Sequence, residues 1–456
     1  MKHRILNVLF LLTTAFVLSS CLGSSDDNTY TYYEDAAITA FNLGTMNLYV
    51  DNGDGTTTKK TYTGSTYKFY IDQENGLIYN PDSLPYGTDA EHVVMTITAM
   101  NSGVVFWKTI DEDDYTYYIS SDSVDVSVDR QLRVLSQSGN HYRDYTLKVN
   151  VHKEDGDLFA WKTPQDTDEE GNVIGNADLS ALQGMKALAL NGEMFVFGTD
   201  GTKTVIYSTN QNDGKTWTER TPSIVLSAEA YKGVITNKNQ FYVIDGENLL
   251  SSPDAISWQV VKEAIGLKQL IAATPAYIYG ISADGKIMVS SNDGKDWSAD
   301  EVEEGNDDKL PAMTEGFVYT TLKTNSDMGQ VTVFGKDASD KTVIWLKTTD
   351  DEDASAYPWS LIEAGSQTPQ LTSISVFGYG DNIMMLGLKD GTATNFLVSK
   401  DSGLNWAADT TYKLPVELAT EVFTATVDEK NFIWLINGEG GQVWRGRLNR
   451  LGWEKQ

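Results

Sequence analysis

Alternation of apolar and polar residues dominates the chain and predicts β-strands throughout most of its length. Between residues 32 and 153 the alternation is short and irregular, and Asn52-Gly53 and Asp54-Gly55 supply turn chemistry between strands. The predicted strands of this stretch cover residues 37–41, 68–71, 92–98, 124–128 and 143–151. We therefore predict a small β-sandwich over residues 32–153.

From residue 158 onward the strand pattern repeats, with a tryptophan as its marker. Six tryptophans spaced 39 to 62 residues apart follow predicted turns, namely Trp217, Trp258, Trp297, Trp359, Trp406 and Trp453. A period of about 40–50 residues in an all-β sequence is typical of the four-stranded blades of a β-propeller. Residues 158–456 are therefore predicted to form six blades, with a strand at Leu158–Trp161 completing the last blade. If that strand starts a blade of its own, the ring has seven.

Several of these tryptophans end an octet of the form Ser-x-Asp-x-Gly-x-x-Trp, best preserved as SKDSGLNW. Asp or Asn in the octet can accept amide hydrogen bonds of its own turn, Gly can adopt positive φ, and Trp can bury a large face. We interpret the octets as structural. Their members are Asn212, Gly214, Trp217, Ser290, Asn292, Gly294, Trp297, Ser399, Asp401, Gly403 and Trp406, and a fourth copy keeps Ser251 and Trp258 but lacks the glycine.

The octet resembles the Asp-box, or BNR repeat, of sialidase-type propellers. The resemblance implies that the octets lie at blade peripheries, away from a catalytic mouth. Sialidases hold the carboxylate of their substrate with three arginines from different blades. Here Arg220 follows the first marker tryptophan, and the other arginines of residues 158–456 crowd into the last repeat as Arg445, Arg447 and Arg450. Sialidase activity is therefore not expected.

The residue types that many enzymes and metal sites require are missing from the predicted propeller. The four histidines are His3, His92, His141 and His152, and Cys21 is the only cysteine. This excludes a Ser-His-Asp or Cys-His mechanism there, and it excludes a zinc site with histidine or cysteine ligands. Acidic runs at 111–114, 166–171 and 350–353 could hold calcium, but the second lacks the glutamate of an EF-hand at its twelfth position. We interpret them as solvated loops and expect no cofactor, metal or catalytic residue.

The N-terminus predicts export and lipid anchoring. Basic residues followed by an apolar run at 5–18 are typical of a secretory signal peptide, predicted over residues 1–20. Leu18-Ser19-Ser20-Cys21 resembles a bacterial lipobox, which implies lipidation of Cys21 and a lipidated tether over residues 21–31. The acidic residues just behind Cys21 resemble the surface-export signal of Bacteroides-type lipoproteins. An outer-membrane lipoprotein exposed at the cell surface is predicted, with a periplasm-facing one as the alternative.

The overall charge narrows the possible partners. With a formal net charge of −29, the chain repels phosphate backbones and anionic lipid headgroups. Nucleic-acid binding is therefore not expected, and membrane contact is expected through the lipid anchor only.

Two further segments, AITAFNLG at 37–44 and GLIYNPDSLPYGT at 76–88, resemble uncharacterised Bacteroides-type lipoproteins. That family combines an N-terminal immunoglobulin-like β-sandwich with an Asp-box propeller, and residues 143–151 resemble the last strand of its first domain. The resemblance implies fold and location but no activity. Three hypotheses remain: a non-enzymatic surface protein that binds a glycan or a protein, a divergent glycoside hydrolase or lyase that uses carboxylates, and a structural subunit of an outer-membrane uptake complex.

Overall fold

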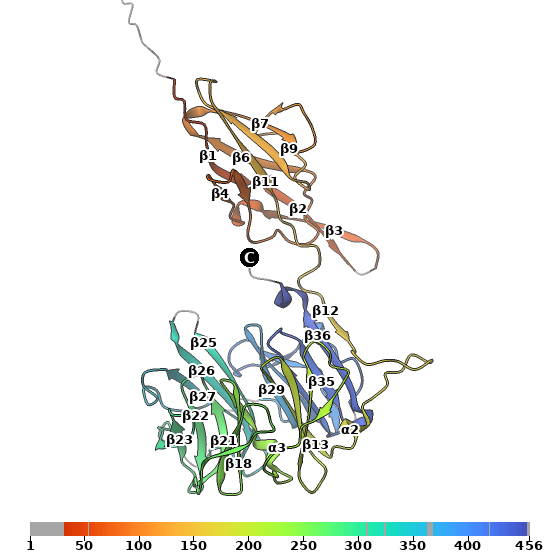
Figure 1. Cartoon of the computed structure of the whole chain (residues 1–456), viewed down its shortest axis with the longest axis vertical. Coiled ribbons are helices and arrows are strands. Elements are labelled where there is room, and N and C mark those ends of the chain that lie inside the picture. Colours follow the sequence, from red (N-terminus) through yellow and green to blue (C-terminus); the bar gives the residue numbers. More distant parts are fainter. Residues whose placement is uncertain are drawn as a thin grey trace, which may run out of the picture. The chain divides into compact units, whose positions relative to one another are not determined.

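The computed structural model describes residues 32–52, 54–306, 309–322, 325–362, 368–418 and 420–453. The predicted signal peptide, Cys21 and the predicted tether lie outside the described residues. The chain divides into two all-β units, with the boundary between residues 154 and 155 (Figure 1). Within the described residues, no helix is both long and apolar enough to cross a membrane.

The first unit is a β-sandwich. A three-stranded sheet in the order β1-β6-β9 and a six-stranded sheet in the order β4-β5-β11-β10-β7-β8 share one core, to which Ile38 and Val93 contribute from the first sheet and Leu132 and Tyr145 from the second. Strands β2 and β3 form a separate hairpin. The strands are β1 (Ile38–Leu43), β2 (Thr45–Asp51), β3 (Thr57–Thr63), β4 (Tyr70–Asp72), β5 (Leu77–Tyr79), β6 (Val93–Ala99), β7 (Val104–Thr109), β8 (Thr116–Tyr117), β9 (Ser123–Val124), β10 (Arg130–Leu135) and β11 (Tyr142–Lys148).

One predicted strand of this unit is mostly wrong. Residues 124–128 were expected to be extended, but β9 ends at Val124. The carboxylate of Asp125 accepts the Ser127 amide at 2.8 Å and bends the chain at once. Its other oxygen accepts a hydrogen bond from Arg130 at 2.8 Å. Local side-chain bonding of this kind competes with strand pairing.

Over the residues that the structure describes, the second unit consists of six sheets, each containing a four-stranded blade. The connections described include the short helices α2 (Ala177–Ser180) and α3 (Ala230–Gly233). The strands of blades one to three are β13 (Gly184–Leu190), β14 (Glu193–Thr199), β15 (Thr204–Asn210), β16 (Thr218–Glu219), β17 (Ile235–Asn237), β18 (Gln240–Asp245), β19 (Asn248–Ser252), β20 (Gln259–Lys262), β21 (Leu267–Ala273), β22 (Ile278–Ser282), β23 (Ile287–Ser290) and β24 (Ser298–Ala299). Those of blades four to six are β25 (Met313–Leu322), β26 (Asn325–Lys336), β27 (Thr342–Asp350), β28 (Ser360–Ile362), β29 (Thr372–Tyr379), β30 (Asn382–Lys389), β31 (Thr392–Ala393), β32 (Leu397–Ser399), β33 (Ala407–Ala408), β34 (Phe423–Val427), β35 (Ile433–Asn437) and β36 (Gln442–Leu448).

The ring closes through a strand from the beginning of the second unit. Strand β12 (Phe159–Lys162) pairs with β36 and becomes the outer strand of the sixth blade, with Trp161 opposite Gly446. Trp161 Nε1 donates to the Lys413 carbonyl at 2.6 Å, and the Phe159 ring packs edge-on against Tyr412. Closure removes two open sheet edges. The six-bladed propeller and its closing strand are thus confirmed, and the seven-bladed alternative is wrong.

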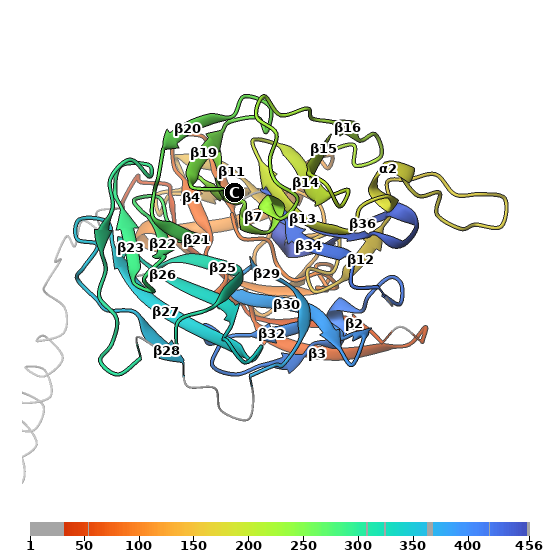
Figure 2. The same cartoon turned by 90° about the horizontal axis from the view of Figure 1, so that it is seen from below.

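The strand order assigns every connection to one of two faces. Successive strands of a blade are antiparallel, so the turns between strands one and two and between strands three and four lie at the same end. We call this end the turn face. The other end, where the chain enters each inner strand, we call the connection face. The inner strands surround the middle of the ring (Figure 2). Side chains join them from blade to blade: Thr424 accepts the Ala187 amide at 2.9 Å and Ser375 accepts the Ala425 amide at 3.0 Å.

Candidate functional site

The octet residues lie on the turn face, in the turns that lead to the outer strands. In the fifth blade, Ser399 Oγ accepts the Gly403 amide at 2.8 Å and donates to Asp401 at 2.9 Å. Asp401 accepts the Asn405 amide, and Trp406 Nε1 donates to the Gly403 carbonyl, both at 2.9 Å. The third blade has the same bonds at 2.8–3.1 Å, made by Ser290, Asn292, Gly294, Asp296 and Trp297. These side chains are thus bonded within their own turns.

The first blade keeps the turn but changes the bonds. Trp217 Nε1 still donates to the Gly214 carbonyl, at 3.2 Å. Asn212 does not accept an amide of its own turn: its oxygen accepts from Lys430 of the sixth blade at 2.5 Å. The carboxylate of Asp213 accepts the Thr216 amide at 2.8 Å instead.

In the second blade, the serine that bonds within the turn is Ser252 and not Ser251, which the sequence pattern predicted. The buried Ser252 donates to Asp254 at 3.1 Å. The turn is one residue shorter than the octet. Ala255 takes the place of glycine at φ +60°, and its carbonyl accepts Trp258 Nε1 at 2.9 Å. The octet spacing, in which the serine lies seven residues before the tryptophan, therefore predicted the wrong serine in this blade.

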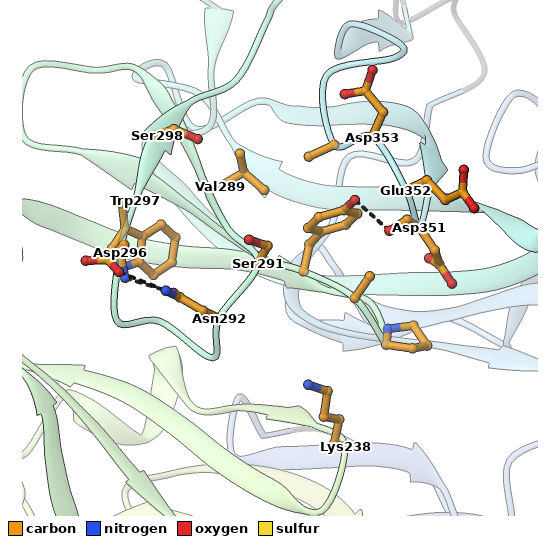
Figure 3. A pocket seen from close by; sticks show the side chains of 14 residues that line it. Lys238, Val289, Ser291, Asn292, Asp296, Trp297, Ser298, Asp351, Glu352 and Asp353 are labelled. Carbon is orange, nitrogen blue, oxygen red and sulfur yellow. Dashed lines mark hydrogen bonds between the residues drawn. The ribbon is translucent and has the colours of Figure 1, made fainter.

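The turn face contains an open groove of about 620 Å³, at the edge of the third blade (Figure 3). Trp297 borders it on one side, the acidic loop of the fourth blade borders it on the other, and Lys238 reaches in from the second blade. The volume lies within the range of about 300–1,000 Å³ that is usual for small-molecule sites. The lining residues are Lys238, Pro275, Ala276, Tyr277, Val289, Ser291, Asn292, Asp296, Trp297, Ser298, Asp351, Glu352, Asp353 and Ala354.

Hydrogen bonds hold the walls of the groove in place. Asn292 Nδ2 donates to Asp296 at 2.8 Å within one turn. The Tyr277 hydroxyl donates to the Asp351 carbonyl at 2.9 Å and so ties the third blade to the acidic loop. Burial, followed by the nearby Asp351, raises the pKa of Tyr277, so its hydroxyl stays protonated at neutral pH. The groove therefore combines fixed polar groups with part of an indole ring.

Family models cover most of the chain. The DUF6242 N-terminal domain of unknown function matches residues 41–149, and the DUF6242 β-propeller domain matches residues 155–456. The chain belongs to the DUF6242 family. No curated protein matches this DUF6242 chain.

Solved structures match the DUF6242 chain at low identity. The SapL1 lectin in complex with α-methyl fucoside is 12% identical with a TM-score of 0.36, and the match covers 56% of this chain and 90% of the lectin. YCF48 from Cyanidioschyzon merolae is 14% identical with a TM-score of 0.33, covering 63% and 98%. The α-L-arabinofuranosidase Arb93A from Fusarium graminearum is 12% identical with a TM-score of 0.36, covering 58% and 92%. With TM-scores of 0.33–0.36, these likenesses carry no inference about a ligand or an activity of this chain.

The arginines of the DUF6242 propeller interact with residues of their own blades. Arg220 donates to Glu193 at 2.7 Å in the first blade. Arg445 lies 4.6 Å above the centre of the Trp434 ring, and Arg447 lies 4.2 Å above that of Phe432, both in the sixth blade. Arg450 pairs with an aspartate near the start of the unit. Within the described ranges, no three His, Cys, Asp or Glu side chains gather as metal ligands would.

The sequence did not reveal the groove of the DUF6242 chain. Its walls come from the turns of three successive blades, and Lys238 and Tyr277 belong to no motif. The sequence feature that came nearest to predicting the groove was the regular spacing of the octets, because this spacing places all turns of this kind on one face of the propeller. Asn292 and Trp297 were identified as fold residues, and the structure shows that they also line a groove.

Proposed function

We propose that this protein is a lipid-anchored, cell-surface binding protein that holds a glycan in the groove beside Trp297. The observation behind the proposal is the composition of the groove, in which a partly exposed indole lies next to Asn292, Ser291 and exposed carboxylates. Sugar rings present apolar C–H faces that pack on aromatic rings, and their hydroxyl groups pair with amide and carboxylate oxygens. A few placed polar groups on an apolar wall are the usual composition of a small-molecule site.

The same groove supports binding rather than hydrolysis. A glycosidase needs one carboxyl group that stays protonated near neutral pH, and burial is the usual means of raising a carboxyl pKa that far. The four carboxyl groups that line the groove are all exposed: Asp296, Asp351, Glu352 and Asp353. We therefore prefer a non-enzymatic function over the hydrolase hypothesis.

Replacing Trp297 by phenylalanine is expected to weaken glycan binding about 5- to 30-fold, because it removes indole surface that contributes roughly 1–2 kcal/mol. Binding is measured on a glycan array of host and plant glycans and then by titration calorimetry. Trp406→Phe is the matched control: Trp406 makes the equivalent indole–carbonyl bond in the fifth blade but does not line the groove. Equal binding by both variants, or release of sugar from any glycan on the array, would contradict the proposal.

Replacing Cys21 by alanine is expected to release the protein from membranes or to block its processing. The reason is that lipidation of the single cysteine would supply the anchor, with each buried methylene adding about 0.8 kcal/mol. Cell fractionation with immunoblotting is the measurement, and Ser24→Ala, three residues further on, is the control. A Cys21→Ala variant that stays in the membrane fraction at the processed size would disprove lipid anchoring.

A further inference from the structure

Two opposite charges lie across the middle of the propeller from one another, on the connection face. Lys186 is in β13 of the first blade and Glu315 is in β25 of the fourth, so their blades are opposite in a ring of six. Both are the third residue of their inner strand, near the end where the connections enter. Each acts electrostatically on the other, but they form no direct ion pair.

A local irregularity places Glu315. The pairing of β25 with β26 shifts register between Thr314 and Gly316, so Glu315 is the extra residue of a β-bulge. Bulges re-aim side chains and are frequent next to functional sites. Without the bulge, Glu315 would stay in the ordinary alternation of the strand.

Both side chains are partly exposed, and neither has a direct ionic partner. Lys186 Nζ donates one hydrogen bond, to the Lys232 carbonyl at 2.9 Å, although an ammonium group has three donors. Glu315 has no hydrogen bond or ion pair within the part of the chain that the structure describes. The ammonium groups near Glu315 have other partners. Lys232 forms an ion pair with Glu229 at 2.6 Å, and Lys336 donates to the Asp340 and Leu371 carbonyls and to the Thr342 hydroxyl.

Because both side chains are only partly exposed, each charge has lost part of its hydration. Burial lowers the pKa of Lys186 to about 8, with Glu315 opposing that shift. Burial likewise raises the pKa of Glu315, although Lys336, Lys186 and Lys232 oppose it. For a charge without a direct ionic partner, even partial loss of hydration is unfavourable. A ligand that bonded to both groups would offset this cost.

We propose that Lys186 and Glu315 form a second binding site, for a sugar acid whose carboxylate accepts from Lys186 and whose hydroxyl groups donate to Glu315. The two groups differ in sign and do not touch, so the complementary ligand carries an anion at one end and hydrogen-bond donors at the other. The protein has a net charge of −29 and repels anions at long range, so a sugar acid needs a local cation such as Lys186. The site is independent of the groove, because it lies on the opposite face.

The test is titration calorimetry of the full chain with trigalacturonic acid, and with neutral galactotriose as the matched ligand. We expect the acid to bind and the neutral sugar not to. Lys186→Met should weaken binding about 10- to 100-fold, as expected for loss of a charged hydrogen bond. Glu315→Gln should weaken it less, because the amide still accepts from hydroxyl groups. Trp297→Phe, in the groove on the turn face, should leave it unchanged.

Affinity should also fall as the pH rises above about 8, because Lys186 loses the proton that attracts the carboxylate. The other charged groups around the pair are Lys232, Glu229, Lys336 and Asp340. Burial raises the pKa of Tyr231, and the Glu229 bond raises that of Lys232, so neither titrates in this range. Lys186→Arg should keep binding and remove the loss at pH 9.

Three results would overturn the proposal: equal affinity of the wild type and Lys186→Met, equal affinity for acid and neutral sugar, or no binding of the acid. Binding of a zwitterionic amino acid in place of the sugar acid would overturn the assigned ligand class. The two proposed sites can be tested separately. If Trp297→Phe no longer binds the glycans of the array but still binds trigalacturonic acid, the groove on the turn face and the Lys186–Glu315 site are independent, so a failure of one proposal leaves the other standing.

Discussion

Replacing Lys347 by methionine is expected to lower the free energy of unfolding by about 3–5 kcal/mol, because it leaves a buried carboxylate without its counter-ion. Lys347 and Asp300 form an ion pair at 2.9 Å with both side chains fully buried. Asp300 also accepts Trp359 Nε1 at 2.8 Å, and the ammonium group donates to the Tyr357 carbonyl at 2.6 Å. The Tyr279 and Trp359 rings flank it, each centre 5.9 Å away. Urea unfolding followed by tryptophan fluorescence measures the effect.

Two further variants make this prediction specific. Lys215→Met removes an exposed ion pair to Asp166, so it should cost less than about 1 kcal/mol. The double variant Lys347→Met/Asp300→Leu removes both buried charges and should be more stable than Lys347→Met alone. If Lys347→Met and Lys215→Met unfold at the same urea concentration, the buried pair does not hold the third and fourth blades together.

Replacing Gly446 by alanine is expected to lower the free energy of unfolding by about 1–3 kcal/mol, because the methyl group meets the closing strand. A Cβ at this position would overlap the Phe159 ring and would lie 2.7 Å from the Trp161 ring. Strand β12 would have to move away from β36 and expose the edge of the sixth blade. Urea unfolding measures the loss, and limited proteolysis near residues 155–163 reports the opened ring.

Gly233→Ala is the control for this substitution. Gly233 has no positive φ, and a methyl group added there would meet nothing within 4 Å, so alanine should be neutral or slightly stabilising. Equal stability of Gly446→Ala and Gly233→Ala would show that the ring does not depend on a closely fitted β12.

Much of the fold could be read from local pattern. A blade is built from neighbouring strands and turns, so its tryptophan, its glycine with positive φ and its turn carboxylate recur at a fixed spacing. Trp297 and Trp406 were found in this way, and each also donates an indole hydrogen bond to a glycine carbonyl of its own turn. The same reasoning failed where spacing changed by one residue, at Ser251, and where a side chain took a partner from another blade, at Asn212.

The candidate sites depend on contacts that no local pattern encodes. Lys238, Trp297 and Asp351 are far apart in sequence but line one groove, because three blades present their turns on the same face. Lys186 and Glu315 are 129 residues apart and come together only because a ring of six blades makes the first blade face the fourth. A one-residue β-bulge, which arises from the pairing of β25 with β26, then takes Glu315 out of the ordinary alternation of the strand.

Local sequence patterns were enough to predict the strand-rich fold, the period of the blades and the chemistry of their turns, since these arise from interactions between residues close along the chain. They also predicted the closing strand, because an unpaired sheet edge is unfavourable. The choice between six and seven blades, the face that each turn occupies and the charges left without partners became known only from the three-dimensional arrangement. These features could not be predicted locally because ring closure and burial involve residues from all blades. The hydration and the partners of a lysine, for example, depend on which side chains the other blades place around it.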